Sequence, residues 1–415
     1  MLRGHGGGHA PVNYLELFFD LVFVFAITQL SHGLLHHLNW YGLTQGLVLF
    51  LAVWWAWIYT AWATNWANPD RMPVRLLLLG VMLLSLSMAV TLPEAFGAQG
   101  LAFAASYVAL QLGRSLGMAL IFAGEGRARL RNMMRIALWF AASAPLWLAG
   151  GMVADANYRL ALWLAALAVE YAGPMAMFVV PGLGRSKVTD WDISGSHMAE
   201  RCALFIIIAL GEGIIVAGAI FASQPPDAAR VAALIIAFVS AVLMWWLYFD
   251  LGAPRGTQLI ASNAQPGRLA RNAYTYLHMP IVLGIVIGAV GDALLIEHST
   301  ERADVRLVLV VCGGAILFLL GVGLFKRFHN TFRNLPFSHL VAIILFAALG
   351  LLGWWRPPSS LVFSGLGCVI LALTALWEWV SYNGGWLERM EARGWRVAAR
   401  FRARAQRRLD RINLD

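Results

Sequence analysis

Charged residues are scarce in this chain: Asp, Glu, Lys and Arg make up 13% of its 415 residues, whereas hydrophobic residues make up 60%. Soluble domains contain roughly 25% charged and 45 to 50% apolar residues. The composition therefore excludes a soluble globular protein. Cysteine is also scarce, and Cys202, Cys312 and Cys368 all lie in apolar segments. The cysteines therefore indicate neither a disulfide framework nor a thiolate metal cluster.

The N-terminal segment lacks an apolar signal-peptide core and a small-residue cleavage site, so we expect no segment to be removed. Twelve apolar runs are long enough to cross a bilayer. They lie at approximately 14–37, 41–64, 73–94, 101–122, 134–152, 159–180, 198–222, 229–251, 273–295, 305–325, 337–355 and 360–381. We predict an all-α polytopic membrane protein with about twelve transmembrane helices, organised as a Gly/His-rich leader (1–13), a transmembrane domain (14–381) and a basic tail (382–415).

The basic residues predict the orientation. They concentrate before the first run, in every second loop and in the tail, whereas the intervening loops hold only five arginines. By the positive-inside rule, both termini face the cytoplasm. The tail between Trp386 and Ile412 places apolar residues at helical spacing among nine arginines. This pattern predicts an amphipathic helix that binds anionic lipid rather than nucleic acid.

Acidic residues interrupt the first apolar run. At 100° per residue, Glu16, Asp20 and Ser31 fall within roughly a 60° sector, so a polar stripe about 22 Å long follows one face. A carboxylate turned toward lipid would cost about 2.5 to 3.5 kcal/mol. The stripe must therefore face protein or water.

The run at 198–222 carries a similar set. His197, Arg201 and Glu212 share one face, and Glu200 lies slightly to its side. With Glu16 and Asp20 these residues can form a buried ion-pair cluster, which is either a structural lock between two helices or a site for a cation or proton. Glu212 stands between two glycines at mid-membrane depth, where desolvation favours a neutral carboxyl that carries a proton or only makes hydrogen bonds.

Other polar residues at membrane depth have less specific interpretations. His278 precedes Pro280 by two residues, so it lies either at a kink that lines a cavity or in an ordinary helix contact. Arg114 requires a partner, and Glu170 and Glu378 are expected to cap helices or join them. Histidines in the leader and at 36–37 lack convergent partners, so the sequence predicts no metal site and no cofactor.

Short sequence pairs recur in the same order in the two halves of the chain, and they predict parallel six-helix repeats at 14–181 and 197–381. The alternative is coincidence in a chain rich in Trp and Arg. The pairs are Glu16 with Glu200, Trp54-Trp55 with Trp245-Trp246, Met72-Pro73 with Met279-Pro280, Arg131-Asn132 with Arg333-Asn334, and Glu170 with Glu378.

Five motifs together resemble the bacterial low temperature requirement protein A family. They are ELFFDLVFVFAITQLSH from Glu16, the W-W-x-W-I-Y-T run from Trp54, HMAERCALFIIIALGE from His197, WWLYFD from Trp245 and AYTYLHMPIVLGI from Ala273. The resemblance covers roughly residues 12 to 380. It implies a polytopic bacterial plasma-membrane protein and no established reaction. Gly213 departs from the family pattern, which commonly has serine there.

The buried titratable groups favour a secondary transporter or ion-translocating protein, which moves a proton, a small ion or a small solute. In this hypothesis Glu16, Asp20, Glu212 and His278 lie on the path, while His197, Glu200 and Arg201 form a charge lock. The alternative is a membrane-integral sensor or scaffold whose buried charges are structural. An intramembrane enzyme is disfavoured because no nucleophile or metal set appears at membrane depth. A monomer and a homodimer both remain open.

Overall fold

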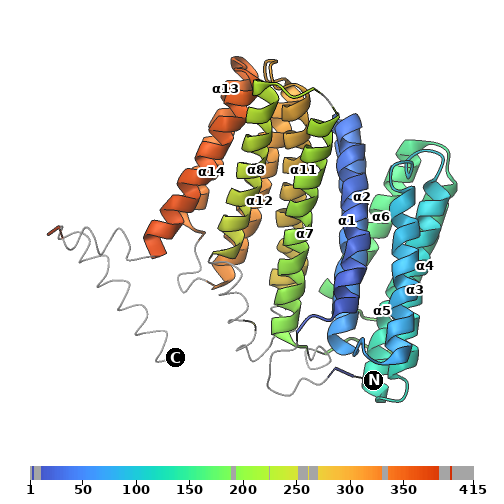
Figure 1. Ribbon diagram of the computed structural model, residues 1–415. Helices are drawn as coiled ribbons and strands as arrows, with labels where there is room; N and C mark the ends of the chain where they lie inside the picture. Colours follow the sequence, from blue (N-terminus) through green and yellow to red (C-terminus); the bar gives the residue numbers. More distant parts are fainter. Residues whose placement is uncertain are drawn as a thin grey trace.

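The computed structural model describes residues 2–3, 11–187, 193–223, 225–250, 260, 270–329, 335–382 and 393–394. Within these residues the chain forms twelve long α-helices that run side by side, which confirms the predicted all-α polytopic fold (Figure 1). The leader histidines His5 and His9 and almost all of the predicted tail helix at 386–412 lie outside the described residues.

The first six helices are α1 (Tyr14–His36), α2 (Trp40–Trp66), α3 (Met72–Thr91), α4 (Gly100–Phe122), α5 (Arg127–Met152) and α6 (Ala156–Met175). The last six are α7 (Gly195–Ala222), α8 (Ala228–Phe249), α11 (His278–Glu297), α12 (Val305–His329), α13 (Phe337–Trp355) and α14 (Ser360–Tyr382). A short π-helix, η2 (Ala270–Tyr276), precedes α11. Eleven of the described helices are long and apolar enough to cross a membrane. The exception is α6, which carries Arg159 and Glu170.

Polar side chains fix several helix starts at the residues where the apolar runs begin. Asn13, Asn39, Asp155, Ser194 and Asp227 each cap the first turn of a helix by accepting a backbone N–H. These caps satisfy amide groups that lack a carbonyl partner within the helix. The lengths of the helices therefore follow from apolar runs bounded by capping residues.

The two halves of the chain pack in the same order. In the first half, α1 contacts α2 and α3, consecutive helices from α3 to α6 contact each other, and α2 also contacts α4 and α6. In the second half, α7 contacts α8 and α11, consecutive helices from α11 to α14 contact each other, and α8 also contacts α12 and α14. These contacts recur at corresponding positions of the two halves, although α8 also packs against α11 in the second half.

The halves meet where α1 and α2 pack against α7, α11 and η2. Here α1 contacts α7 and α11, and α2 contacts α7. In Figure 1, α1 and α7 lie next to each other in the middle of the bundle. Among the eleven apolar helices, α2 is the most deeply buried, and Trp54, Trp55 and Trp57 are fully enclosed. The polar stripe of α1 therefore faces protein.

The irregular segment before α11 is held by side chains from other helices. Pro280 has no N–H to continue the backbone ladder, which releases carbonyl groups upstream. The indole of Trp54 donates to the carbonyl oxygen of Thr275 at 2.9 Å, and Trp62 donates to the Thr275 hydroxyl at 3.0 Å. The crowded tryptophans of α2 thus bind polar atoms of η2 besides filling the interface between the halves.

Candidate functional site

Glu16 lies in the first turn of α1, where its position is fixed by the helix cap. The backbone N–H of Asn13 donates to Glu16 Oε2 at 2.7 Å, so the two residues form a capping box. Arg3 donates to the same oxygen at 3.0 Å, and its own backbone N–H is bound to the carbonyl of Trp66 at the end of α2. The leader thereby supplies a cation to a carboxylate that is 1% exposed.

His197 of α7 contacts the other oxygen of Glu16. Its Nε2 lies 2.9 Å from Glu16 Oε1, and its Nδ1 lies 3.1 Å from Asn65 Nδ2 of α2. The amide of Asn65 can take only one orientation, because its Oδ1 accepts the N–H of Ser194 while its Nδ2 donates to the Ser194 carbonyl. His197 Nδ1 must therefore accept, and the ring is neutral with its proton on Nε2 toward Glu16.

Asp20 and Arg201 form the second ion pair of this cluster. The guanidinium of Arg201 donates to Asp20 Oδ2 at 2.7 Å and to Oδ1 at 2.8 Å, and it also donates to the backbone carbonyl of Glu16 at 2.9 Å. The indole of Trp57 on α2 donates to Asp20 Oδ1 at 2.9 Å. Both charged side chains are fully buried. Bidentate pairing of this kind offsets much of the desolvation of two buried charges.

We call Arg3, Glu16, Asp20, His197 and Arg201 the charge cluster. Two carboxylates, two cations and a neutral imidazole give it no net charge, as burial at membrane depth requires. It joins α1 of the first half to α7 of the second half. The predicted lock residue Glu200 is half-buried on α7, and the contacts just described do not include it.

Glu212 contacts α1 further along the membrane. It lies twelve residues beyond Glu200 on α7, is 1% exposed, and accepts a hydrogen bond from Ser31 at 3.4 Å through Oε2. Oε1 is buried and has no hydrogen-bond partner among the described residues. Glu212 thus differs from Glu16 and Asp20, whose carboxylate oxygens are all hydrogen-bonded. A buried carboxyl oxygen without a donor is costly in apolar surroundings.

His278 contacts residues of the second half, on α8 and on η2. Its Nδ1 lies 2.9 Å from the carbonyl oxygen of Ala273, and its Nε2 lies 2.8 Å from the hydroxyl of Tyr248. Since a carbonyl can only accept, His278 carries a proton on Nδ1. This hydrogen bond closes the turn at the kink before Pro280.

Arg114 reaches the acid Glu170 through two intermediates. Its guanidinium donates to Gln111 Oε1, the Gln111 amide donates to the Tyr107 hydroxyl at 2.8 Å, and Tyr107 donates to Glu170 at 2.6 Å. Ser143 and Trp147 of α5 donate to the other oxygen of Glu170, each at 2.8 Å. Glu170 therefore links α6 to α4 and α5.

Glu378 makes the corresponding contacts between helices in the second half. On α14 it accepts from Lys326 of α12 at 2.5 Å and from Ser338 of α13 at 3.4 Å, and it lies 3.1 Å from His339 Nδ1. The sixth helix of each half thus uses one acid to bind the fourth and fifth helices of that half. These contacts each lie within one half, so they do not join the two halves.

Several residues of these networks were not predicted from the sequence to contact the buried acids. Trp57, Gln111 and Lys326 carry donors on apolar helices, but their spacing does not indicate which acid they meet. Asp292 on α11 is a further acid at membrane depth, and it lies in the run AVGDALL without a polar neighbour. An isolated acid in an apolar run is itself a signal of burial in protein.

Comparisons with known proteins agree with the motifs. The model of the bacterial low temperature requirement A protein family (LtrA) matches residues 11–376. An uncharacterized protein of Rhizobium meliloti (strain 1021), RA0937, is 38% identical over 383 residues, which cover 92% of each chain. No solved structure matches. With its helical bundle, its buried charge cluster and a family match over nearly the whole membrane portion, the chain belongs to the bacterial low temperature requirement A family of multi-pass membrane proteins.

Proposed function

We propose that this chain is a secondary transporter or ion-translocating protein of the bacterial plasma membrane, in which Glu212 binds a proton or a small cation. The proposal rests on the burial and the hydrogen bonding of the Glu212 carboxyl. It is buried between α7 of one half and α1 of the other, and one of its oxygens lacks a hydrogen-bond partner within the described part of the chain. Acids in such positions serve as ion or proton sites in transporters.

In this proposal the charge cluster is a closed gate at one end of the interface between the halves. Glu16 and Asp20 lie within the first two turns of α1, whereas Ser31 and Glu212 lie roughly 15 to 22 Å further along its axis. Opening the gate would separate Asp20 from Arg201 and Glu16 from His197. The six-helix units 14–181 and 197–381 would then move as two bodies, as parallel repeats do in one class of transporter.

A polar pocket supports access from the opposite end. It has a volume of about 390 Å³ and lies between α1, α2 and the segment after α3. Gln29, Gln45 and Glu94 supply polar side chains, and Leu30 of its lining immediately precedes Ser31. By the positive-inside rule the gate faces the cytoplasm and this pocket faces the outside, with the basic tail on anionic lipid of the inner leaflet.

One observation favours the alternative, a membrane-integral sensor or scaffold. Glu16, Asp20, His197 and Arg201 are fully buried and the charge cluster carries no net charge, which also suits a permanent lock between α1 and α7. In that case Glu212 would be a neutral acid bound to Ser31, without exchange of a proton or cation.

Measurement of ion flux in proteoliposomes distinguishes ion translocation from a sensor or scaffold role. Purified protein would be tested for proton and alkali-cation flux under an imposed pH gradient and under an imposed voltage. We expect flux in the wild type, its loss in Glu212→Gln, and wild-type flux in Glu297→Gln, which changes an exposed acid at the end of α11. Absence of wild-type flux under both conditions would refute ion translocation and favour the scaffold. Wild-type flux in Glu212→Gln would remove this residue from the path.

A further inference from the structure

A second cavity lies on a different face of α7 from the charge cluster. It is a groove of about 390 Å³ between α7, α8 and α11, a size typical of small-molecule sites. The groove exists because small residues line part of it, among them Gly213, Gly218, Ala237 and Gly288. The rim residues Ile214, Ile235 and Phe238 are exposed on the outer surface of the bundle, so the groove opens sideways, where the bilayer lies.

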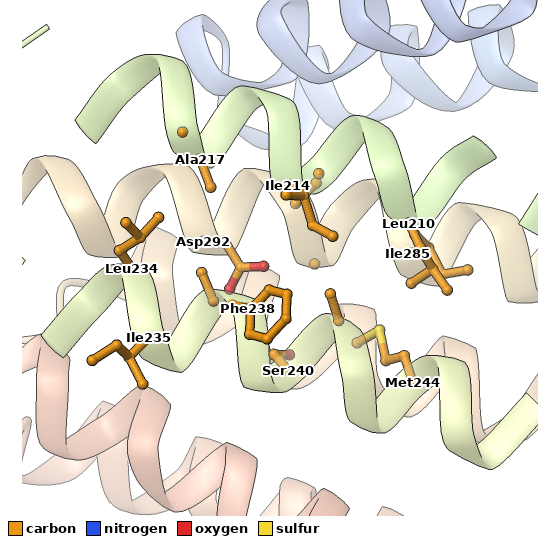
Figure 2. Close-up of a pocket in the computed structure, with 16 residues that line it drawn as sticks. Leu210, Ile214, Ala217, Leu234, Ile235, Phe238, Ser240, Met244, Ile285 and Asp292 are labelled. Atoms are coloured by element: carbon orange, nitrogen blue, oxygen red, sulfur yellow. The ribbon is translucent and has the colours of Figure 1, made fainter. Parts of the chain in front are cut away.

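Asp292 is the single charged residue of the groove lining, and Ser240 supplies a hydroxyl. Figure 2 shows the carboxyl of Asp292 extending from α11 among apolar side chains of α7 and α8, with Phe238 beside it. No hydrogen bond or ion pair binds it among the described residues, and the lining contains no Lys, Arg or His. A carboxylate in these apolar surroundings is destabilised unless a cation pairs with it or it takes up a proton.

The position of Asp292 sets the shape of a matching ligand. It lies five residues before the end of α11 at Glu297, about 7.5 Å along the helix, whereas Ile285 marks the deep end of the groove about 10 Å further inward. A charged head would therefore sit near the membrane surface and an apolar chain would extend toward the bilayer centre. A phosphate next to that head would meet Asp292 and no basic residue, which disfavours zwitterionic phospholipid.

We propose that this groove binds an amphiphilic organic cation, a molecule with one positively charged nitrogen on an apolar chain, which enters from the bilayer and pairs with Asp292. The proposal does not rest on ion translocation through Glu212. Glu212 contacts α1, whereas the groove faces α8 and α11, and binding needs no gradient.

The test measures saturable binding of tritiated decyltrimethylammonium to the purified full-length chain in phosphatidylcholine nanodiscs. We expect Asp292→Asn to weaken binding at least about tenfold, because the desolvated ion pair is lost. Gly218→Leu should do the same by filling the groove, since a side chain at Gly218 meets open space and needs no backbone shift. Uncharged decanol should compete at least about tenfold less well than the unlabelled cation.

Two matched controls lie on the same helices. Glu297→Gln removes an exposed acid from α11, and Gly211→Leu adds a side chain to α7 at a position that also has open space but does not line the groove. Both should keep the wild-type affinity within about twofold. Unchanged affinity in Asp292→Asn would overturn the proposal. Equal competition by decanol and by the unlabelled cation would also overturn it. Either result would mean that the groove binds apolar chains without recognising the positive charge. The decanol comparison uses wild-type protein, so it decides even if a variant misfolds.

Discussion

Replacing Arg201 by methionine tests whether the charge cluster stabilises the contact between α1 and α7. The change removes the cation that binds both oxygens of Asp20 and leaves this carboxylate fully buried. Trp57 would remain as its donor. Loss of one partner from a buried ion pair costs about 3 to 5 kcal/mol, because the other charge stays desolvated. We expect a loss of this size in the free energy of unfolding.

A variant of Asp20 and a double variant of Asp20 and Arg201 give the coupling free energy between these two residues. Asp20→Leu strands the Arg201 guanidinium, so it should cost a similar amount. Replacing Asp20 by leucine and Arg201 by methionine together removes both charges, and substitution of a whole buried pair by apolar residues is often neutral or stabilising. We therefore expect the double variant to be more stable than either single variant, with a coupling energy above about 2 kcal/mol.

Unfolding would be followed in detergent micelles by thermal and denaturant titration with tryptophan fluorescence. Asp304→Asn is the control, because Asp304 pairs with Arg306 at 2.6 Å in an exposed position, where an ion pair contributes about 0.2 to 1 kcal/mol. If Arg201→Met costs less than about 1 kcal/mol, the reasoning from buried charge fails. It also fails if the costs of the two single changes simply add in the double variant.

Three further predictions concern protonation and packing. Nitrogen NMR should find His197 protonated on Nε2 and His278 on Nδ1, because their hydrogen-bond partners require a proton on different nitrogens of the two rings; the same tautomer in both rings would contradict the geometry. Gly284→Ala should cost about 1 to 3 kcal/mol, since its Cβ would lie 2.5 Å from a backbone nitrogen of α12, whereas Gly313→Ala meets open space; equal melting temperatures would refute this. Burial opposes ionisation of Asp304, but hydrogen bonds from the backbone N–H of the third residue after it and from the neighbouring arginine lower its pKa below 3.8. Its stabilising contribution is therefore present above pH 3.8 and lost as the pH falls below it, so the gap in melting temperature between wild type and Asp304→Asn should close on acidification.

The sequence was sufficient to predict the helices and the helix faces that are buried. A segment in lipid must satisfy every backbone hydrogen bond internally, so an apolar run near 20 residues has no alternative to a helix. The spacing of Glu16 and Asp20 then placed both acids on one face, and the cost of exposing them to lipid required that face to meet protein. The same argument, applied to the apolar run of α7, places His197 and Arg201 on a face that must contact protein.

The hydrogen-bond and ion-pair partners that a side chain finds on neighbouring helices could not be predicted from the sequence in this way. Arg114 needed an acid, but its connection to Glu170 passes through Gln111 and Tyr107, which lie on the same helix as Arg114. Asp292 gave no polar stripe, so periodicity did not distinguish it from an acid at a helix end. The sequence set Glu212 apart from Glu16, but it did not show that one oxygen of Glu212 lacks a hydrogen-bond partner among the described residues, whereas both oxygens of Glu16 have one.

What the sequence by itself determined is therefore the class of protein, the position of each helix and the face that each buried acid occupies, because these depend on local hydrophobicity and helical period. Only the tertiary structure decided which side chain meets which acid, the tautomer of each histidine and the groove next to Asp292. These depend on how neighbouring helices rotate and pack. A side chain's partner lies on another helix, at a distance set by packing and not by sequence separation.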